Sequence, residues 1–487
     1  MNTVANTICS NAQKFPEKTA IHDEKGSITY AQLDHAVKNF AKHLKGLGLP
    51  SGSRIMVQSN SDIPTVVSYL AIQLSGNINV PCEKTASVDA LELIASETEA
   101  AVIITDADVD GRYTRITFSE VMDIAGADDG NCSFEFDEPD PEAVCDILFT
   151  TGTTGKSKGV MISNRALLAS CGNLITGSEI TETTVYLIPV PINHANGIRK
   201  TYSTLFAGGT VVLLEGLSNL KKFYGAISEF HANYLLLPPS AIRMILLLSA
   251  KDLAAHADQI EYVHTSAAPF PEADKQKLCE LLPNTKLVFA YGSSEVANVS
   301  MFEYSKYPGR ICCVGSLNIN AKAKIVDEDG NEIESSKDNQ GIIMLGGSAV
   351  MTGYYNAPEL TAGVLKDGWV KTSDLGYFDE DGFLYVLGRA DDVINVGGLK
   401  IAPTEVENVV MQYKGIAECA CFGIDDRMTG KIPKLNIVPE RRVEIDIGDL
   451  KKFLASKMEA YKVPKKIEIV AEIPKTSNGK INRKVLK

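Results

Sequence analysis

The sequence predicts an α/β protein: a large N-terminal domain of parallel or mixed sheets covered by helices, with a small β-barrel, followed by a small α+β domain. Three observations predict this. The chain has 487 residues and is 45% hydrophobic, whereas a single core stops growing at roughly 250–300 residues. Strand-like and helical patterns alternate up to about residue 320, as in a sheet covered on both faces. The pattern then changes to short strands and turns.

The first element with clear limits is a helix at residues 29–48. Leu33 and Val37 are among five apolar residues at helical spacing, with Thr29 as N-cap and Gly48 as the stop. The next segments predict strand, helix and strand in turn, at residues 53–59, 64–76 and 100–105. This order indicates a parallel sheet.

A turn-rich acidic segment, residues 134–146, leads into a predicted strand, DILFT. Further strands are predicted at residues 210–216, 232–239, 260–266 and 286–292. Residues 321–390 predict the small antiparallel sheet or barrel. Helices at residues 402–413 and 447–458 and a strand at residues 416–424 follow. We therefore predict domains at residues 1–390 and 391–487.

Composition and charge exclude several classes of function. The net charge is −13 and no basic run dominates any region, so no nucleic-acid partner is expected. No segment is long or apolar enough for a membrane span, and the N-terminus lacks a signal-peptide pattern. A cytoplasmic enzyme is expected. Cys419 and Cys421 would share one face of a strand, which favours buried thiols over a metal site.

A glycine- and threonine-rich stretch, FTTGTTGKSKGVMIS at residues 149–163, is typical of a phosphate-binding loop. A Walker loop would need glycine where Thr150 stands, and a dinucleotide loop would need Gly-x-Gly, which is absent from the stretch. Four threonines, two glycines and a lysine could instead surround a polyphosphate with N–H groups, hydroxyls and charge. These residues are Thr150, Thr151, Gly152, Thr153, Thr154, Gly155 and Lys158.

The stretch is one of six motifs, in matching order, through which the chain resembles the adenylate-forming enzymes. That family includes acyl- and aryl-CoA synthetases, firefly-type luciferases and adenylation domains of peptide synthetases. The other five motifs are PINHANG (191–197), YGSSE (291–295), GYYNAPELT (353–361), the segment 368–398 and PKTSNGKINR (474–483). The resemblance covers nearly the whole chain and is nearest to the acyl-CoA synthetase branch.

The resemblance implies a ligase that activates a small-molecule carboxylic acid of fatty or aryl acid metabolism. ATP is cleaved to give an acyl-adenylate and pyrophosphate, and a thiol then displaces AMP. The expected cofactors are ATP, Mg²⁺ and coenzyme A. Two alternatives remain open: a free-standing adenylation enzyme that loads the phosphopantetheine arm of a separate acyl carrier protein, and, less favoured, a nucleotide-binding regulator without catalytic activity.

The same resemblance assigns roles around ATP. The loop with Lys158 would hold the β- and γ-phosphates. In YGSSE, Tyr291 would lie against the adenine, Ser294 would donate to the α-phosphate, and Glu295 would bind Mg²⁺. Gly292 is also assigned to the ATP site. Ribose contacts are assigned to Asp374 and Arg389. Serine replaces the usual threonine at position 294, and Ser373 replaces a usual glycine beside the aspartate.

The C-terminal motif carries the expected catalytic lysine. By resemblance, Lys480 bridges the substrate carboxylate and the α-phosphate, neutralising charge as the new bond forms. Asp391 aligns with the hinge about which the C-terminal domain rotates. In the second orientation, Gly397 and Gly398 would border the thiol channel.

The acid pocket is assigned less specifically. His194 matches a gate beside the substrate carboxylate, with Asn193 and Gly197 nearby, and no aspartate for an α-ammonium lies between residues 192 and 202. One hypothesis is that Arg199, Lys200 or Arg243 meets a second polar or carboxylate group of the substrate. The alternative is that these three side chains are exposed on helices that flank the pocket.

Overall fold

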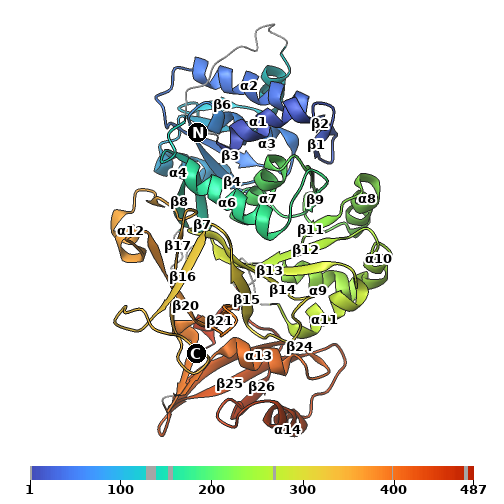
Figure 1. The fold of residues 1–487 in the computed structure, drawn as a ribbon, viewed down its shortest axis with the longest axis vertical. Helices are drawn as coiled ribbons and strands as arrows, with labels where there is room; N and C mark the ends of the chain where they lie inside the picture. Colours follow the sequence, from blue (N-terminus) through green and yellow to red (C-terminus); the bar gives the residue numbers. More distant parts are fainter. Residues whose placement is uncertain are drawn as a thin grey trace.

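The computed structural model describes residues 3–127, 139–151, 157–266, 270–397, 399–475 and 481–486, which form three β-sheets with helices packed on them (Figure 1). Within these residues the sheets have seven, fourteen and five strands. The first two sheets belong to the N-terminal part of the chain, and the third lies at the C-terminal end.

The first sheet is parallel along β6-β5-β3-β4-β7 and continues with antiparallel β8 and β18. Its strands are β3 (Arg54–Ser59), β4 (Ile78–Glu83), β5 (Val102–Ile104), β6 (Thr114–Ile116), β7 (Val144–Thr151), β8 (Ser157–Ser163) and β18 (Gly353–Tyr354). Alternate strand residues enter two cores. One core includes helices α2 (Tyr30–Gly46), α3 (Ile63–Leu74) and α5 (Phe118–Ala125), and the other includes α4 (Val88–Thr98).

The second sheet is parallel along β1-β10-β9-β11-β12-β13 and antiparallel beyond β13. Its first strands are β1 (Thr19–His22), β2 (Ser27–Thr29), β9 (Val185–Ile188), β10 (Thr210–Leu213), β11 (Tyr234–Leu236), β12 (Tyr262–Ser266) and β13 (Lys286–Ser293). Helices α1 (Val4–Lys14), α6 (Asn164–Gly177) and α7 (Ala195–Phe206) share one core with both large sheets. Helices α8 (Leu220–Phe230), α9 (Pro239–Leu248), α10 (Ala250–Ala254) and α11 (Glu272–Leu281) contribute to the core on its other face.

The antiparallel end of this sheet encloses a core of its own. The strands are β14 (Ala297–Glu303), β15 (Cys313–Leu317), β16 (Ala321–Val326), β17 (Gly341–Gly347), β19 (Leu365–Lys366), β20 (Trp369–Phe378) and β21 (Leu384–Arg389), with α12 (Pro358–Val364) beside them. Val299 of β14, Ile325 of β16 and Ile343 of β17 meet in this core. The short antiparallel strands predicted after residue 320 are therefore present, and they extend the large sheet.

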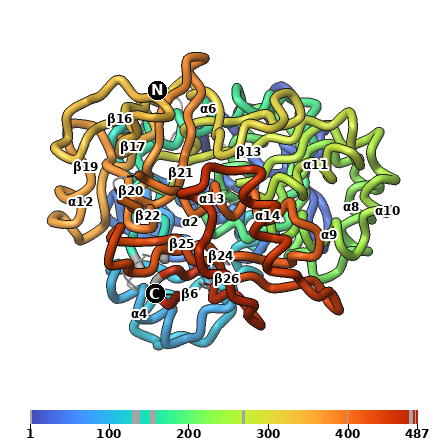
Figure 2. Tube along the Cα trace, turned by 90° about the horizontal axis from the view of Figure 1, so that it is seen from below, coloured from blue at the N-terminus to red at the C-terminus, as the bar shows by residue number. Residues whose placement is uncertain are grey.

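The third sheet follows a short 3-10 turn, η1 (Ala390–Asp392). It contains β22 (Ile394–Val396), β23 (Leu399–Ile401), β24 (Ile416–Asp426), β25 (Gly430–Pro439) and β26 (Lys466–Ile469), packed with α13 (Pro403–Val410) and α14 (Ile447–Lys457); η2 (Arg483–Val485) follows. This segment, coloured orange to red, lies at the lower end of the molecule in Figure 1, and Figure 2, seen from below, shows it across the middle of the view. Cys419 and Cys421 are buried in its core, as predicted.

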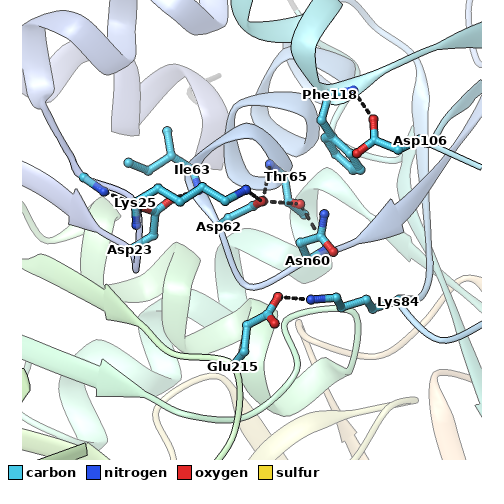
Figure 3. A network of polar contacts seen from close by, with 11 residues as sticks. Asp23, Lys25, Asn60, Asp62, Ile63, Thr65, Lys84, Asp106, Phe118 and Glu215 are labelled. Atoms are coloured by element: carbon cyan, nitrogen blue, oxygen red, sulfur yellow. Dashed lines mark hydrogen bonds and ion pairs between the residues drawn. The ribbon is translucent and has the colours of Figure 1, made fainter. Parts of the chain in front are cut away.

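Polar contacts join the first two sheets near the N-terminus (Figure 3). Lys84, at the end of β4, forms an ion pair with Glu215, which follows β10. The carboxylate of Asp23, after β1, accepts a hydrogen bond of 2.9 Å from the backbone N–H of Ile63 in α3. Asp62 caps the same helix. These contacts help to fix the relative position of the two sheets.

The predicted α2 agrees with the structure in detail. Thr29 is its N-cap, in a capping box with Gln32, and the helix ends just before Gly48, which has a φ of +67°. Among the described helices, none combines the length and the apolar character that crossing a membrane requires.

Candidate active site

The predicted phosphate loop lies between two antiparallel strands. β7 and β8 pair along their length, so that Thr150 stands opposite Lys158. Gly152, Thr153, Thr154 and Gly155 lie outside the described residues, as does the side chain of Thr151. A strand follows the loop here, whereas a helix follows it in Walker and dinucleotide-binding loops. The topology therefore agrees with the rejection of both motifs.

A continuous line of contacts leads from this hairpin to Glu295. The ammonium of Lys158 lies 5.3 Å from the centre of the Tyr354 ring, and the Tyr354 hydroxyl donates a 2.8 Å hydrogen bond to Oε1 of Glu295. Tyr354 belongs to β18, which pairs with β8. Three segments that are distant in sequence thus bring a cation, a phenol and a carboxylate to one place.

The turn that carries Glu295 is held by Arg199. This buried guanidinium donates hydrogen bonds to the carbonyl oxygens of Ser293, at 3.1 Å, and Ser294, at 2.8 Å. Burial lowers the pKa of Arg199 to about 10, although Glu295 acts in the opposite direction. Gly292 leaves no room for a Cβ against the Ala297 carbonyl. The hydrogen bonds from Arg199 and the close packing at Gly292 therefore both hold this turn in place.

Tyr291, Asp374 and Arg389 meet beside this turn. The Tyr291 hydroxyl donates a 2.6 Å hydrogen bond to Oδ2 of Asp374, and Nε of Arg389 lies 3.8 Å from Oδ1 of the same carboxylate. Asp374 and Arg389 are opposite each other on β20 and β21. Burial raises the pKa of Tyr291 far above its usual value, and Asp374 adds to the effect. The phenol is therefore a donor at neutral pH.

Asp146 lies in β7, close to Arg199. Its carboxylate is 1% exposed and accepts hydrogen bonds from Gln73, at 2.8 Å, and Asn79, at 3.3 Å. Burial nevertheless raises its pKa to about 6; Gln73, Asn79 and Arg199 lower it by less. A polar residue in an otherwise apolar strand was the only sequence signal for this position.

Replacing Asp146 by asparagine should stabilise the protein at pH 8 and have little effect at pH 4. Because the folded-state pKa is raised from 3.8 to about 6, this carboxyl stabilises the fold most below pH 3.8, and the contribution is lost as the pH rises through 6. Between these two pH limits, the contribution of this carboxyl to the free energy of unfolding changes by about 3 kcal/mol. Melting temperatures of both proteins from pH 4 to 8 measure it. A constant difference across this range would contradict the assignment.

The predicted acid-gate residues surround the start of α7. His194 is the N-cap residue, with a half-exposed ring whose Nε2 lies 4.0 Å from Glu83. Asn193 is buried. A Cβ at Gly197 would lie 2.5 Å from the Pro191 carbonyl oxygen, so glycine is needed there for packing. The gate role of His194 stays a prediction.

The three basic residues assigned to the acid pocket differ in position. Arg199 and Lys200 are 4% and 1% exposed, so the expectation that they are exposed was wrong. Arg199 reaches the turn at Ser293. Arg243 donates to the carbonyl oxygen of Ala417 in β24 and lies 3.8 Å from Asp274 in α11. Arg243 therefore contacts the C-terminal sheet. The sequence could not indicate this contact, because Arg243 and Ala417 are far apart in the chain.

Comparison with known proteins decides the family. The profile described as AMP-binding enzyme matches residues 9–355, and the profile described as AMP-binding enzyme C-terminal domain matches residues 405–480. The chain belongs to the AMP-binding enzymes. Feruloyl-CoA synthase from an Amycolatopsis species is 26% identical over 96% of this chain and 95% of its own. Oxalate--CoA ligase from Arabidopsis thaliana is 25% identical over 100% and 98%.

A solved structure of an AMP-binding enzyme agrees with the fold throughout. ATP-bound MatB from Rhodopseudomonas palustris superposes with a TM-score of 0.86, at 25% identity over 100% of this chain and 98% of MatB. The chain is an adenylate-forming acyl-CoA ligase, as the sequence predicted. Its substrates are a carboxylic acid, ATP and coenzyme A.

The residues predicted for the C-terminal part of this AMP-binding enzyme lie in or near the third sheet or outside the described residues. Lys480 and Gly398 lie outside the described residues. Asp391 is exposed within η1, and Gly397 has a φ of +59° between β22 and β23. Their roles as hinge and thiol channel, and the domain boundary at 391, stay predictions.

Sequence reasoning missed two residues that contact the predicted site. Tyr354 was quoted within a motif but given no role, although its hydroxyl contacts Glu295. Asn196 lies inside the PINHANG motif and accepts a hydrogen bond from Lys200. Motif membership was the available signal in both cases, and only the fold shows which side chains these residues meet.

Proposed function

We propose that this acyl-CoA ligase holds ATP between the Tyr291 group and the Lys158 hairpin. The observation that carries the proposal is the contact line from Lys158 through Tyr354 to Glu295, next to the Tyr291–Asp374–Arg389 group. The first end supplies positive charge for phosphates, and the second supplies an aromatic ring and polar groups for a nucleoside. The Lys158 end therefore suits the phosphates of a nucleotide, and the Tyr291 end suits its base and ribose.

Mg²⁺ is proposed to bind at Glu295. This carboxylate is half-buried and Tyr354 orients one of its oxygens. Mg²⁺ commonly binds one or two carboxylates together with substrate phosphate oxygens, and the donor set here fits that pattern. When bound, the ion would neutralise phosphate charge. Arg199 fixes the turn, so the carboxylate keeps its orientation.

In the proposed first step, a carboxylate oxygen of the acid attacks the α-phosphorus of ATP. The bond to the β-phosphate breaks and pyrophosphate leaves. Lys158 and the loop beside it would hold the leaving phosphates, and Ser294 would donate to the α-phosphate. Lys480 would lie between the two reacting anions, where a cation lowers their repulsion. In the second step the thiolate of coenzyme A attacks the acyl carbon and AMP leaves.

The acceptor follows from the family, since the relatives named above are CoA ligases or synthases. Neither alternative from the sequence, loading of a carrier protein or a regulatory role without catalysis, has an observation in its favour. The acids named in these two relatives, feruloyl and oxalate, differ in size, aromaticity and charge.

The direct test is pyrophosphate–ATP exchange with a panel of short, medium, aromatic and dicarboxylic acids. At least one acid should support exchange, and addition of coenzyme A should then give the acyl-CoA and AMP. Mass spectrometry of the product identifies the thioester. If no acid supported exchange with the purified protein, the proposal would fail.

A further inference from the structure

A polar cluster, buried except for Asn196, lies one helical turn beyond the start of α7. We use the name polar cluster for Asn196, Lys200, His264 and Ser266. Nζ of Lys200 donates a 2.6 Å hydrogen bond to Oδ1 of Asn196, and the Ser266 hydroxyl lies 3.3 Å from the same oxygen. His264 and Ser266 belong to β12, which lies between β11 and β13 in the sheet. Helix α7 and strand β12 lie near the middle of the molecule (Figure 1).

The charge of the polar cluster is not balanced. Lys200 is 1% exposed, and within the described ranges the acceptor that its ammonium meets is the neutral amide oxygen of Asn196. Burial, together with a smaller effect of the neighbouring Arg199, lowers the pKa of Lys200 to about 7. A buried ammonium with one neutral acceptor is costly for a fold. Its retention in the centre of the protein therefore calls for a function.

His264 is a second, independent sign of an unmet partner. The ring is completely buried, and within the part of the chain described here neither of its nitrogens has a hydrogen-bond partner. Burial, followed by the charge on Lys200, lowers its pKa far below the usual value, so the ring is neutral and still offers one N–H donor. Buried polar groups are nearly always paired in native proteins. An acceptor-rich ligand would satisfy both residues.

The position of the polar cluster relates it to the proposed acid site. His194 is at the N-cap of α7, and Lys200 is six residues further, which is about 9 Å along a helix. Between them, Asn196 is only partly buried and links the two positions. Arg199, adjacent to Lys200, reaches the turn that carries Glu295. An acid held by its reacting carboxylate near His194 could extend toward Lys200.

We propose that the polar cluster binds a second carboxylate of the acid substrate, so that the ligase prefers dicarboxylic acids to monocarboxylic acids of equal length. This inference rests on the proposed function for the position of the reacting carboxylate. Lys200 supplies the charge, while Asn196 and His264 supply hydrogen-bond donors. Arg199, whose donors already meet Ser293 and Ser294, holds the turn instead.

The test compares matched linear acids: glutarate with valerate, adipate with hexanoate, and suberate with octanoate. For at least one pair, kcat/KM in pyrophosphate exchange should favour the diacid by about 10-fold to 100-fold, the range for a charge-assisted contact. Lys200→Met should remove most of this preference, measured as the ratio of kcat/KM for the diacid to kcat/KM for the monoacid. Lys221→Met, at an exposed position of α8, is the matched control and should keep the preference.

Calorimetry separates this inference from the proposed function. Binding of the same acids is measured in the presence of α,β-methylene ATP, so that the measurement does not require turnover. Tighter binding of a diacid to the wild type than to Lys200→Met supports the polar cluster as a subsite, even if no acid is activated. Equal binding of diacids and monoacids to the wild type would overturn the inference, even if monoacids are activated.

The stability of Lys200→Met checks that a loss of preference is not a loss of fold. Methionine fills a similar volume without the buried charge, so the melting temperature of the variant should equal or exceed that of the wild type. A diacid preference that persists in the folded variant would also overturn the inference.

Discussion

Replacing Lys480 by alanine should reduce acid-dependent pyrophosphate exchange by about 10²–10³-fold, the loss seen when one group that stabilises developing charge is removed. The transfer of an acyl group from a supplied acyl-adenylate to coenzyme A should persist, because the proposed lysine role ends with the first step. Lys475 and Ile481 form an antiparallel bridge, so the chain on either side of Lys480 is held together. Radiolabelled pyrophosphate exchange and thioester formation, measured separately, give the two results.

The matched control is Lys475→Ala, five residues earlier. Lys475 is an exposed residue in an ion pair with Glu418, and exposed pairs contribute little to stability. This variant should keep both steps within a few-fold of the wild type. Equal losses of both steps in Lys480→Ala would contradict the assignment and indicate a folding defect.

Replacing Glu295 by glutamine should lower exchange by about 10²–10³-fold and raise the Mg²⁺ concentration needed for half-maximal rate. Glutamine keeps an oxygen that can accept the hydrogen bond from Tyr354 but lacks the charge that a hard cation requires. The Mg²⁺ dependence distinguishes a metal ligand from a residue that only supports the turn. It is measured by titration at saturating ATP and acid.

Two further variants make this prediction sharper. Tyr354→Phe removes the hydrogen bond that orients Glu295, and should reduce exchange by about 10-fold with a smaller shift in Mg²⁺ dependence. Glu359→Gln changes an exposed carboxylate on nearby α12 and should have no effect. If Glu295→Gln kept the wild-type Mg²⁺ dependence, Glu295 would not be the metal ligand.

Local patterns predicted most elements of the fold. Thr29 and the apolar residues after it specified α2 almost to the residue, because capping and helical periodicity are properties of neighbouring residues. The change of pattern after residue 320 identified the antiparallel strands. The continuous sheet that joins them to the parallel strands was not predictable in the same way, because strand order depends on pairing between distant segments.

The site shows the same division. The motifs predicted four site residues from the sequence: Tyr291, Glu295, Asp374 and Arg389. The structure brings Tyr291 and Arg389 into contact with Asp374. Tyr354 and Arg199 were not recognised as partners of the YGSSE turn. Each meets it through tertiary contacts across at least 59 positions of sequence, and no local pattern encodes such contacts.

The sequence by itself determined the family, the reaction and the residue types that its chemistry needs, because ordered motifs carry that information in the chain. Tertiary structure alone decided which basic residues are buried. Arg199 and Lys200 are adjacent on α7. Arg199 supports the turn that carries Glu295, whereas Lys200 meets Asn196 beside His264, whose ring nitrogens have no hydrogen-bond partner among the described residues. The physical reason is that adjacent residues of a helix point in directions about 100° apart, so their environments are set by different neighbours.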